Sequence, residues 1–164
     1  MDVMIVRSDL YNEENPPKDY THILAATDLN SQAHTAAEKA AAIADAYKAK
    51  LTLFHVIEYF PVDRENEVIT PENQDPMGYQ INLKREVLNS IADAIGHPNA
   101  NQEVITTNGS ASMAVPDYAR EHNADLMVIG SQVNYGVKVL LGATADGIVH
   151  RAKCDVLVVH PGEK

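Results

Sequence analysis

The sequence has little of what marks secreted, membrane-spanning or nucleic-acid-binding proteins. Its one cysteine excludes an intramolecular disulfide and suits a reducing compartment. Acids outnumber bases by 23 to 13, and the formal charge of -10 disfavours binding to nucleic acid or to an anionic membrane surface. No apolar run approaches the roughly 20 residues that cross a bilayer, and the first residues carry acids where a signal peptide carries bases. These absences favour a cytoplasmic protein.

Catalytic and metal-binding motifs are missing as well. The dinucleotide fingerprint GxGxxG and the phosphate loop GxxxxGK[ST] are both absent. No serine lies in a nucleophile-elbow context, and no general acid/base pair is identifiable. The seven histidines do not pair with a carboxylate or thiolate at zinc-ligand spacing, so scattered surface or strand-end positions explain them better. We therefore predict no catalytic site and no metal site.

What the sequence does contain is a regular alternation of apolar runs and helical periodicities. Short uninterrupted apolar runs are typical of strands buried on both faces, as parallel sheets contain. The segment 31–47 instead places its apolar residues, mostly alanines, in a single helical stripe. The predicted strands are 22–27, 51–57, 103–107, 126–129 and 156–159, and the predicted helices are 31–47, 78–95, 112–123 and 143–152.

This alternation predicts one α/β domain over residues 20–164. Its fold would be a single open sheet of five parallel strands, with helices on both faces and right-handed crossovers. The strand order that we expect for this sheet is 3-2-1-4-5. Residues 1–19 form an N-terminal extension, with a possible short strand at Val3–Val6 followed by a tail or strap. The proline-rich, acidic stretch 58–76 has no usable period and is expected to be an insert.

The strand order also predicts where a ligand would bind. In such sheets ligands lie beyond the carboxyl ends of the strands, at the point where strand order reverses. Asp28 and Gly130 would face each other across this crevice. Asp28 could accept hydrogen bonds from a ribose or a base, or it could instead cap the following helix. Gly136 and Gly142 allow a close approach of backbone to ligand, although ordinary turn chemistry explains them as well.

Four segments resemble those of a known family, the universal stress proteins. They are THILAATDLN, LTLFHVIE, ADLMVIGS and AKCDVLVVHP, and the resemblance covers residues 20–161. It implies an adenine-nucleotide α-hydrolase-like, flavodoxin-like three-layer sandwich. It also implies a homodimer that forms through the last strand of the sheet.

The ATP-binding motif of that family is altered in this chain. ATP-binding members carry Gly-x2-Gly-x9-Gly-Ser/Thr, and here Gly130 and Gly142 match the first and third glycines. Val133 replaces the second glycine, the spacer is one residue short, and Ala143 replaces the hydroxyl residue, with Thr144 beside it. This pattern resembles the branch of the family that does not bind ATP. The residues predicted to bound a nucleotide crevice are Asp28, Gly130, Gly136, Gly142, Ala143 and Thr144.

Three functions remain open on this basis. The first is a non-enzymatic dimeric stress-response protein that acts through unidentified protein partners. The second is a sensor that binds ATP or another adenine nucleotide with a modified phosphate loop. The third is a flavin carrier or an enzyme on a similar sheet. For the dimer, the apolar residues Val156, Leu157, Val158 and Val159 form a predicted edge strand, which would pair with the same strand of a second copy.

Overall fold

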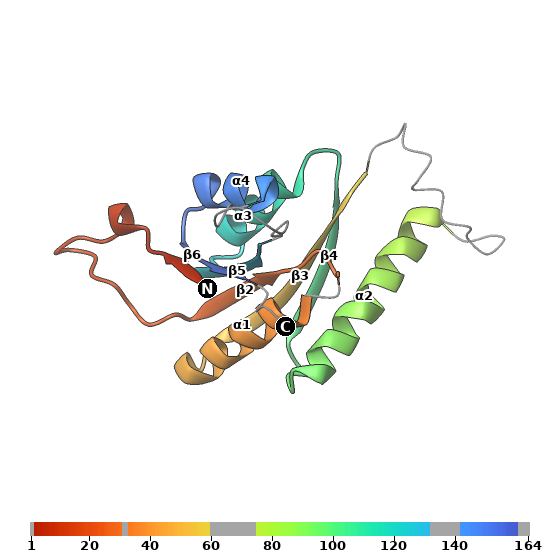
Figure 1. Cartoon of the computed structure of the whole chain (residues 1–164), viewed down its shortest axis with the longest axis horizontal. Coiled ribbons are helices and arrows are strands. Elements are labelled where there is room, and N and C mark those ends of the chain that lie inside the picture. Colours follow the sequence, from red (N-terminus) through yellow and green to blue (C-terminus); the bar gives the residue numbers. More distant parts are fainter. Residues whose placement is uncertain (1, 31–32, 60–74, 132–141, 161–164) are drawn as a thin grey trace.

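The computed structural model describes residues 2–30, 33–59, 75–131 and 142–160, which form a three-layer α/β fold around one sheet (Figure 1). The strands are β1 (Val3–Ile5), β2 (His22–Ala26), β3 (Lys50–Glu58), β4 (Asn101–Thr107), β5 (Leu126–Gly130) and β6 (Asp155–Val159). The helices are α1 (Ala33–Tyr47), α2 (Pro76–Ala94), α3 (Ala111–Glu121) and α4 (Ala143–Arg151), with a short 3-10 turn, η1, at Ser8–Leu10. Within these described residues, no helix combines the length and the apolar character needed to cross a membrane.

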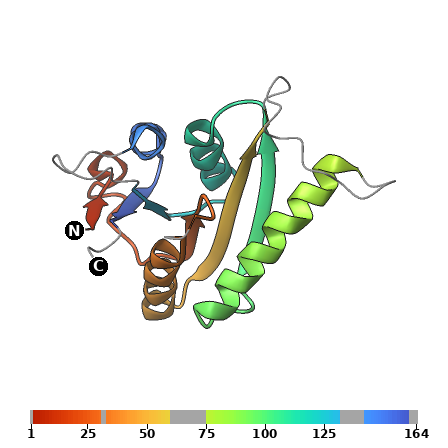
Figure 2. The same ribbon diagram turned by 45° about the vertical axis from the view of Figure 1, so that its right-hand side comes forward.

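Two apolar cores lie on opposite faces of the sheet. Helices α1 and α2 cover one face and α3 and α4 cover the other (Figures 1 and 2). The small side chains of α1, Ala33 and Ala40 among them, are buried against β2 and β5, which lets this helix lie close to the strands. On the other face, Phe54 of β3 stacks on Tyr118 of α3 with ring centroids 4.2 Å apart.

The predicted order of the five parallel strands is confirmed. The sheet runs β1-β6-β5-β2-β3-β4, so the parallel strands follow the predicted order 3-2-1-4-5. Strands β2 and β5 lie side by side in the centre, with Ile23 opposite Leu126. The chain leaves β2 for α1 on one face and leaves β5 for α4 on the other, so the order reverses between these two strands.

The sixth strand corrects the prediction for the sheet's edge. Strand β1 pairs antiparallel with β6, with Val3 opposite Val158 and Ile5 opposite Val156. The sheet is therefore six-stranded and mixed, and β6 lies between β5 and β1 instead of at the edge. The extension reaches β6 because the segment between η1 and β2 returns without a helix, as expected for Pro16-Pro17.

Two helix predictions need smaller corrections. Helix α2 begins at Pro76 rather than at residue 78, because the Asp75 side chain caps it by accepting from the N–H of Gly78 at 2.8 Å. Helix α3 begins at Ala111 rather than at residue 112 and ends at Glu121 rather than at residue 123, and Pro116 lies in its second turn. After the end of α2 the chain turns at Gly96, whose φ of 75° favours glycine.

A close approach of α3 and α4 makes Gly147 sensitive to substitution. A Cβ at Gly147 would lie 2.7 Å from Cβ of Ser112, so Gly147→Ala forces the two helices apart. Such overpacking costs about 1–3 kcal/mol, partly offset by the helix propensity of alanine, about 1 kcal/mol. We expect a lower urea midpoint for Gly147→Ala. The control Gly109→Ala meets its nearest atom, Thr107 Oγ1, at an ordinary 3.5 Å and should leave the midpoint unchanged. Equal midpoints for the two variants would contradict this packing.

Candidate functional site

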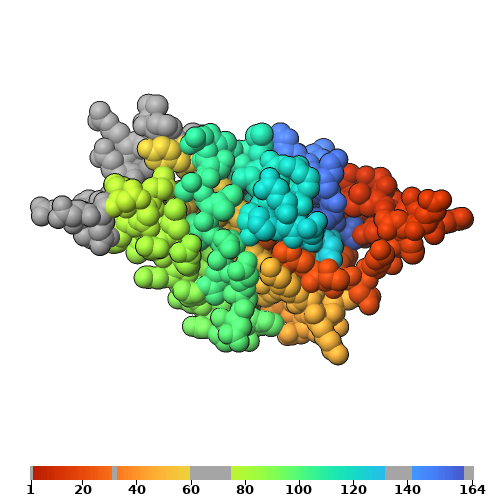
Figure 3. Space-filling model, turned by 180° about the vertical axis from the view of Figure 1, so that it is seen from behind, coloured from red at the N-terminus to blue at the C-terminus, as the bar shows by residue number. Residues whose placement is uncertain are grey.

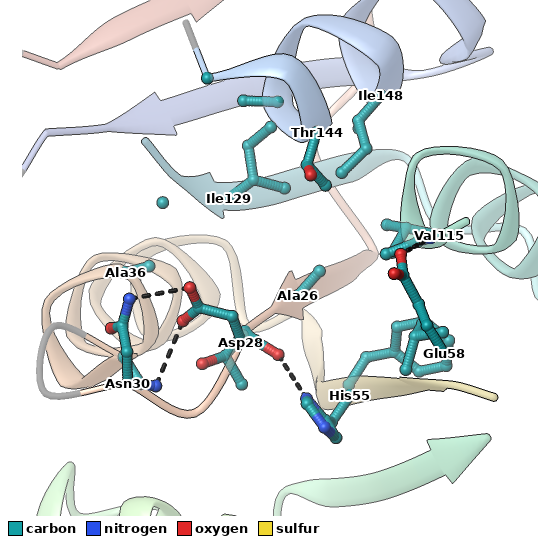
Figure 4. Close-up of a pocket in the computed structure, with 18 of the residues that line it drawn as sticks. Ala26, Asp28, Asn30, Ala36, His55, Glu58, Val115, Ile129, Thr144 and Ile148 are labelled. Carbon is teal, nitrogen blue, oxygen red and sulfur yellow. Dashed lines mark hydrogen bonds between the residues drawn. The ribbon is translucent and has the colours of Figure 1, made fainter. Parts of the chain in front are cut away.

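A cavity of about 870 Å³ opens at the carboxyl ends of the parallel strands, where β2 and β5 diverge (Figure 4). Its floor comes from the ends of β2, β3 and β5, and its walls come from the four helices. Such a volume suits a small organic ligand. Of the six residues predicted for a nucleotide crevice, Asp28, Gly130, Gly142, Ala143 and Thr144 line this one cavity, whereas Gly136 lies outside the described residues.

The carboxylate of Asp28 organises the turn between β2 and α1. Its Oδ1 accepts from the backbone N–H of Asn30 at 3.2 Å, and its Oδ2 accepts from the Asn30 side-chain amide at 2.8 Å. Between them, Leu29 has a φ of 60°, an uncommon conformation for a residue other than glycine. Strained backbone of this kind concentrates at ligand sites. Asp28 thus shapes the rim of the cavity, and its contact with a ligand stays a prediction.

A buried histidine forms part of the cavity wall on the α2 side. His55 lies within β3, and its Nδ1 is 2.8 Å from the carbonyl oxygen of Thr27. A carbonyl oxygen only accepts, so Nδ1 carries the proton and Nε2 presents a lone pair. Burial lowers the pKa of His55, which keeps the ring neutral at pH 7. The expectation of surface or strand-end histidines is wrong here, and the apolar run around His55 was the available signal.

His22 forms a second buried histidine contact at the opposite end of the sheet. Its Nδ1 lies 3.0 Å from the carbonyl oxygen of His122, and its Nε2 lies 2.9 Å from the hydroxyl of Thr52. Burial lowers the pKa of His22 as well. This contact joins β2, β3 and the end of α3, and so it supports the sheet from below the cavity.

The two lowered histidine pKa values predict a pH-dependent stability. Below about pH 6.5 the unfolded chain binds protons at His22 and His55 that the folded chain does not bind. The free energy of unfolding should therefore fall as the pH drops from 7 to 5, by up to about 1.4 kcal/mol per pH unit for each histidine. Urea unfolding at several pH values measures this slope. His22→Asn should flatten it, whereas His34→Gln, at an exposed position of α1, should not; an unchanged slope in His22→Asn would contradict the assignment.

Glu58 closes the cavity on the α3 side. Its carboxylate Oε1 accepts from the backbone N–H of Ala111, the first residue of α3. Ser110, at the N-cap position, makes no side-chain cap bond and instead shares a hydrogen bond with Ser112. A carboxylate at a helix N-terminus also complements the helix dipole. Glu58 therefore acts as a cap supplied by another element, and this contact could not be found from local sequence patterns.

The walls of the cavity are mostly apolar and carry little positive charge. Ile129 and Ile148 lie on the α4 side (Figure 4). Leu83 of α2, 38% exposed, also lines the cavity. Among the described lining residues, Lys84 is the one lysine or arginine, against the two carboxylates of Asp28 and Glu58. Apolar walls with a few polar groups suit a flat, largely apolar ring system better than a highly charged group.

The start of α4 forms the remaining part of the cavity rim. Gly142 is the N-cap residue, and it has no side chain that could cap the helix. Thr144 is exposed and lies above the cavity between Ile129 and Ile148 (Figure 4). The first N–H groups of a helix attract an anion, but Asp146 in the same turn opposes that attraction. This end of the cavity therefore offers a weak anion site.

The cysteine thiol and the metal-binding side-chain types form no reactive centre in the described part of the chain. Cys154 is buried just before β6, and burial raises the pKa of its thiol to about 12, so the thiolate is not formed at neutral pH. Over the described ranges, no three His, Cys, Asp or Glu side chains gather closely enough to hold a metal ion.

A doubly wound α/β sheet with a cavity at its topological switch point defines a class of ligand-binding domains. Comparison with known proteins narrows this class. A family model for the universal stress protein family matches residues 19–160. Universal stress protein A homolog 1 of Coxiella burnetii is 34% identical over 140 residues, which cover 85% of this chain and 96% of the homologue. The chain belongs to the universal stress protein family.

Solved structures of the same family share the fold. Universal stress protein UspA from Lactobacillus plantarum aligns with a TM-score of 0.64 and 23% identity, over 87% of this chain and 99% of that protein. A universal stress protein in complex with cAMP aligns with a TM-score of 0.61 and 26% identity, over 87% of this chain and 98% of that protein. The resemblance of the four sequence segments to this family is thereby confirmed.

Proposed function

We propose that this protein is a non-enzymatic, cytoplasmic regulator that binds an adenine nucleotide with few phosphate charges and acts through a protein partner. The observation that carries the proposal is the cavity of about 870 Å³ at the β2–β5 switch point, with apolar walls and a rim of turn and helix-end backbone. An adenosine moiety fits such a space by size and by its flat apolar ring. The cAMP complex of a relative with 26% identity supports the same class of ligand.

The charge of the cavity supports a nucleotide with few phosphates. ATP carries several negative charges, which need cations or several free N–H donors. Among the described lining residues, Lys84 is the one lysine or arginine, against the two carboxylates of Asp28 and Glu58, and Asp146 lies in the first turn of α4. Ala143 also supplies no hydroxyl where the ATP-binding pattern has one. These features weaken the binding of a nucleotide monophosphate less than they weaken the binding of a triphosphate.

The roles of the titratable groups in the cavity support a protein without catalysis. His55 donates to the Thr27 carbonyl, and Glu58 caps α3. Asp28 holds the turn around Asn30. A general acid or base must reach a reacting atom with a suitably poised pKa. These three side chains are instead engaged in holding the backbone that forms the cavity.

Calorimetric titration with adenosine, AMP, cAMP and ATP tests this proposal. We expect measurable binding of AMP or cAMP and weaker binding of ATP, together with unchanged nucleotide after prolonged incubation. Tighter binding of ATP would mean that the altered loop still holds a triphosphate, as in a nucleotide sensor. No heat with any of the four ligands would contradict the ligand class, and yellow protein with flavin absorbance would favour a flavin carrier. Turnover of any nucleotide would contradict the absence of catalysis.

A further inference from the structure

The N-terminal strap, residues 2–11, covers the outer edge of β6. Strand β1 supplies its ladder, with Val3 opposite Val158 and Ile5 opposite Val156. In Figure 1 this segment lies at one end of the molecule, and Figure 3 shows its exposed face beside α4. The strap thus takes the position that an additional strand would occupy in a larger sheet.

Every backbone position along the outer edge of β6 is engaged by the strap. The N–H of Ser131 donates to the carbonyl of Val159, so Val159 directs its backbone toward β5. Because backbone groups alternate along a strand, Val156 and Val158 direct theirs toward β1. Beyond the ladder, the N–H of His160 donates to the Asp2 carboxylate at 3.1 Å.

A single buried carboxylate anchors the other end of the strap. Asp155 is 3% exposed, and its Oδ1 accepts from the backbone N–H of Arg7 at 2.8 Å. Its Oδ2 accepts from the hydroxyls of Tyr11 at 3.0 Å and Tyr20 at 2.9 Å. Two of these three donors belong to the strap, so its departure would leave a buried carboxylate with fewer partners.

The apolar attachment of the strap is shallow by comparison. Val3 and Ile5 are half-buried, whereas Met4 and Val6 are 42% and 54% exposed. Strand β1 has three residues against five in β6, and η1 buries no residue. A short strand with few buried side chains opens more readily than the core strands.

We propose that the strap and a second copy of this chain compete for the outer edge of β6. A twofold axis through Leu157 would make two β6 strands antiparallel, which is also the direction of β1 against β6. Val156 of one copy would then pair with Val158 of the other, through the same backbone groups that hold Ile5 and Val3. Docking of the strap and pairing of β6 therefore exclude each other. When the strap is docked, the outer edge of β6 is closed. When the strap is released, this edge pairs with β6 of the second copy.

The double variant Val3→Asp, Ile5→Asp in the full chain tests this competition without changing β6. Two carboxylates on the half-buried side of β1 should release the strap. Trypsin should then remove residues 1–7 after Arg7, as read from the intact mass, and light scattering should report twice the mass of the wild-type species. The matched control Met4→Asp, Val6→Asp adds the same charge at exposed positions. It should keep both the protection of Arg7 and the wild-type mass.

A synthetic peptide of residues 2–11 supplies a second test in the same samples. The peptide should return the double variant to the wild-type mass, whereas the peptide with Val3→Asp and Ile5→Asp should not. Far-UV circular dichroism verifies that the variant is folded. The proposal is overturned if Arg7 becomes accessible while the mass stays that of the wild type. It is overturned equally if Arg7 stays protected in the double variant, or if the peptide leaves the larger species intact.

Discussion

Thr144→Trp should weaken the binding of an adenine nucleotide at least about tenfold, a loss of about 1.4 kcal/mol. Thr144 is exposed at the start of α4 and lines the cavity between Ile129 and Ile148. An indole ring there has room to turn over the opening without disturbing the core, and it would occupy space that the ligand needs. Calorimetric titration with AMP measures the change, and an unfolding curve like that of the wild type excludes a general loss of structure.

The control for this variant lies on the same helix. His150→Trp places the same ring at an exposed position in the last turn of α4, which does not line the cavity. Its affinity for AMP should stay within about twofold of the wild type, a change of under about 0.5 kcal/mol. If both variants lose affinity alike, the effect does not come from the cavity. If neither does, the ligand binds elsewhere.

Phe54→Ala should lower the free energy of unfolding by about 3–5 kcal/mol, the usual cost of removing a buried phenyl ring. Phe54 is 0% exposed and stacks on Tyr118, whose ring lies 3.8 Å from that of His122. The lost ring therefore leaves a cavity between the sheet and α3, and the surrounding strands cannot close it without leaving their register. Urea unfolding measures the loss.

The control for this variant is an exposed aromatic residue directly after the end of β3. Tyr59 follows β3 and is 39% exposed, so Tyr59→Ala should change stability by no more than about 0.5 kcal/mol. A loss of less than about 1 kcal/mol in Phe54→Ala would mean that the ring is not packed between β3 and α3 as described.

The central part of the fold could be predicted because its sequence signals are local. The apolar runs within β2, β5 and β6 are uninterrupted, as burial on both faces requires, and that of β3 is broken only by Thr52 and His55. Helix α1 carries one continuous stripe of small residues. Those periods fix the element types, and the alternation of strand and helix restricts the sheet to a few strand orders with right-handed crossovers, among them the observed one.

What could not be predicted depends on contacts between distant residues. The pairing of β1 with β6 rests on Asp155, which accepts from Arg7, 148 positions earlier in the chain. The cap of α3 comes from Glu58, 53 positions away. The spacing of the histidines excludes a zinc motif but carries no information on burial, and the position of His55 within a buried strand places it inside. No local pattern carries these contacts.

The position of the cavity was predictable in part for the same reason, whereas ligand binding by the residues that line it stays a prediction. Asp28 and Gly130 end neighbouring strands, so the strand order alone brings them to one crevice. The contributions of α2 and α3, such as Lys84 and Val115, depend on how the helices lie over the sheet. The part of the cavity wall that α2 and α3 form could therefore not be predicted from the sequence.

The most direct test of the account is a titration of isotope-labelled protein with AMP, followed by nuclear magnetic resonance of the backbone amides. Binding in the cavity predicts saturable shifts confined to its rim, at 27–30, 129–131 and 142–145, with the amides of β1 unchanged. The absence of shifts at AMP concentrations on the order of millimolar would contradict nucleotide binding, because weaker affinity would exceed the usual range for specific ligands. Shifts confined to a surface outside the cavity would contradict the site itself.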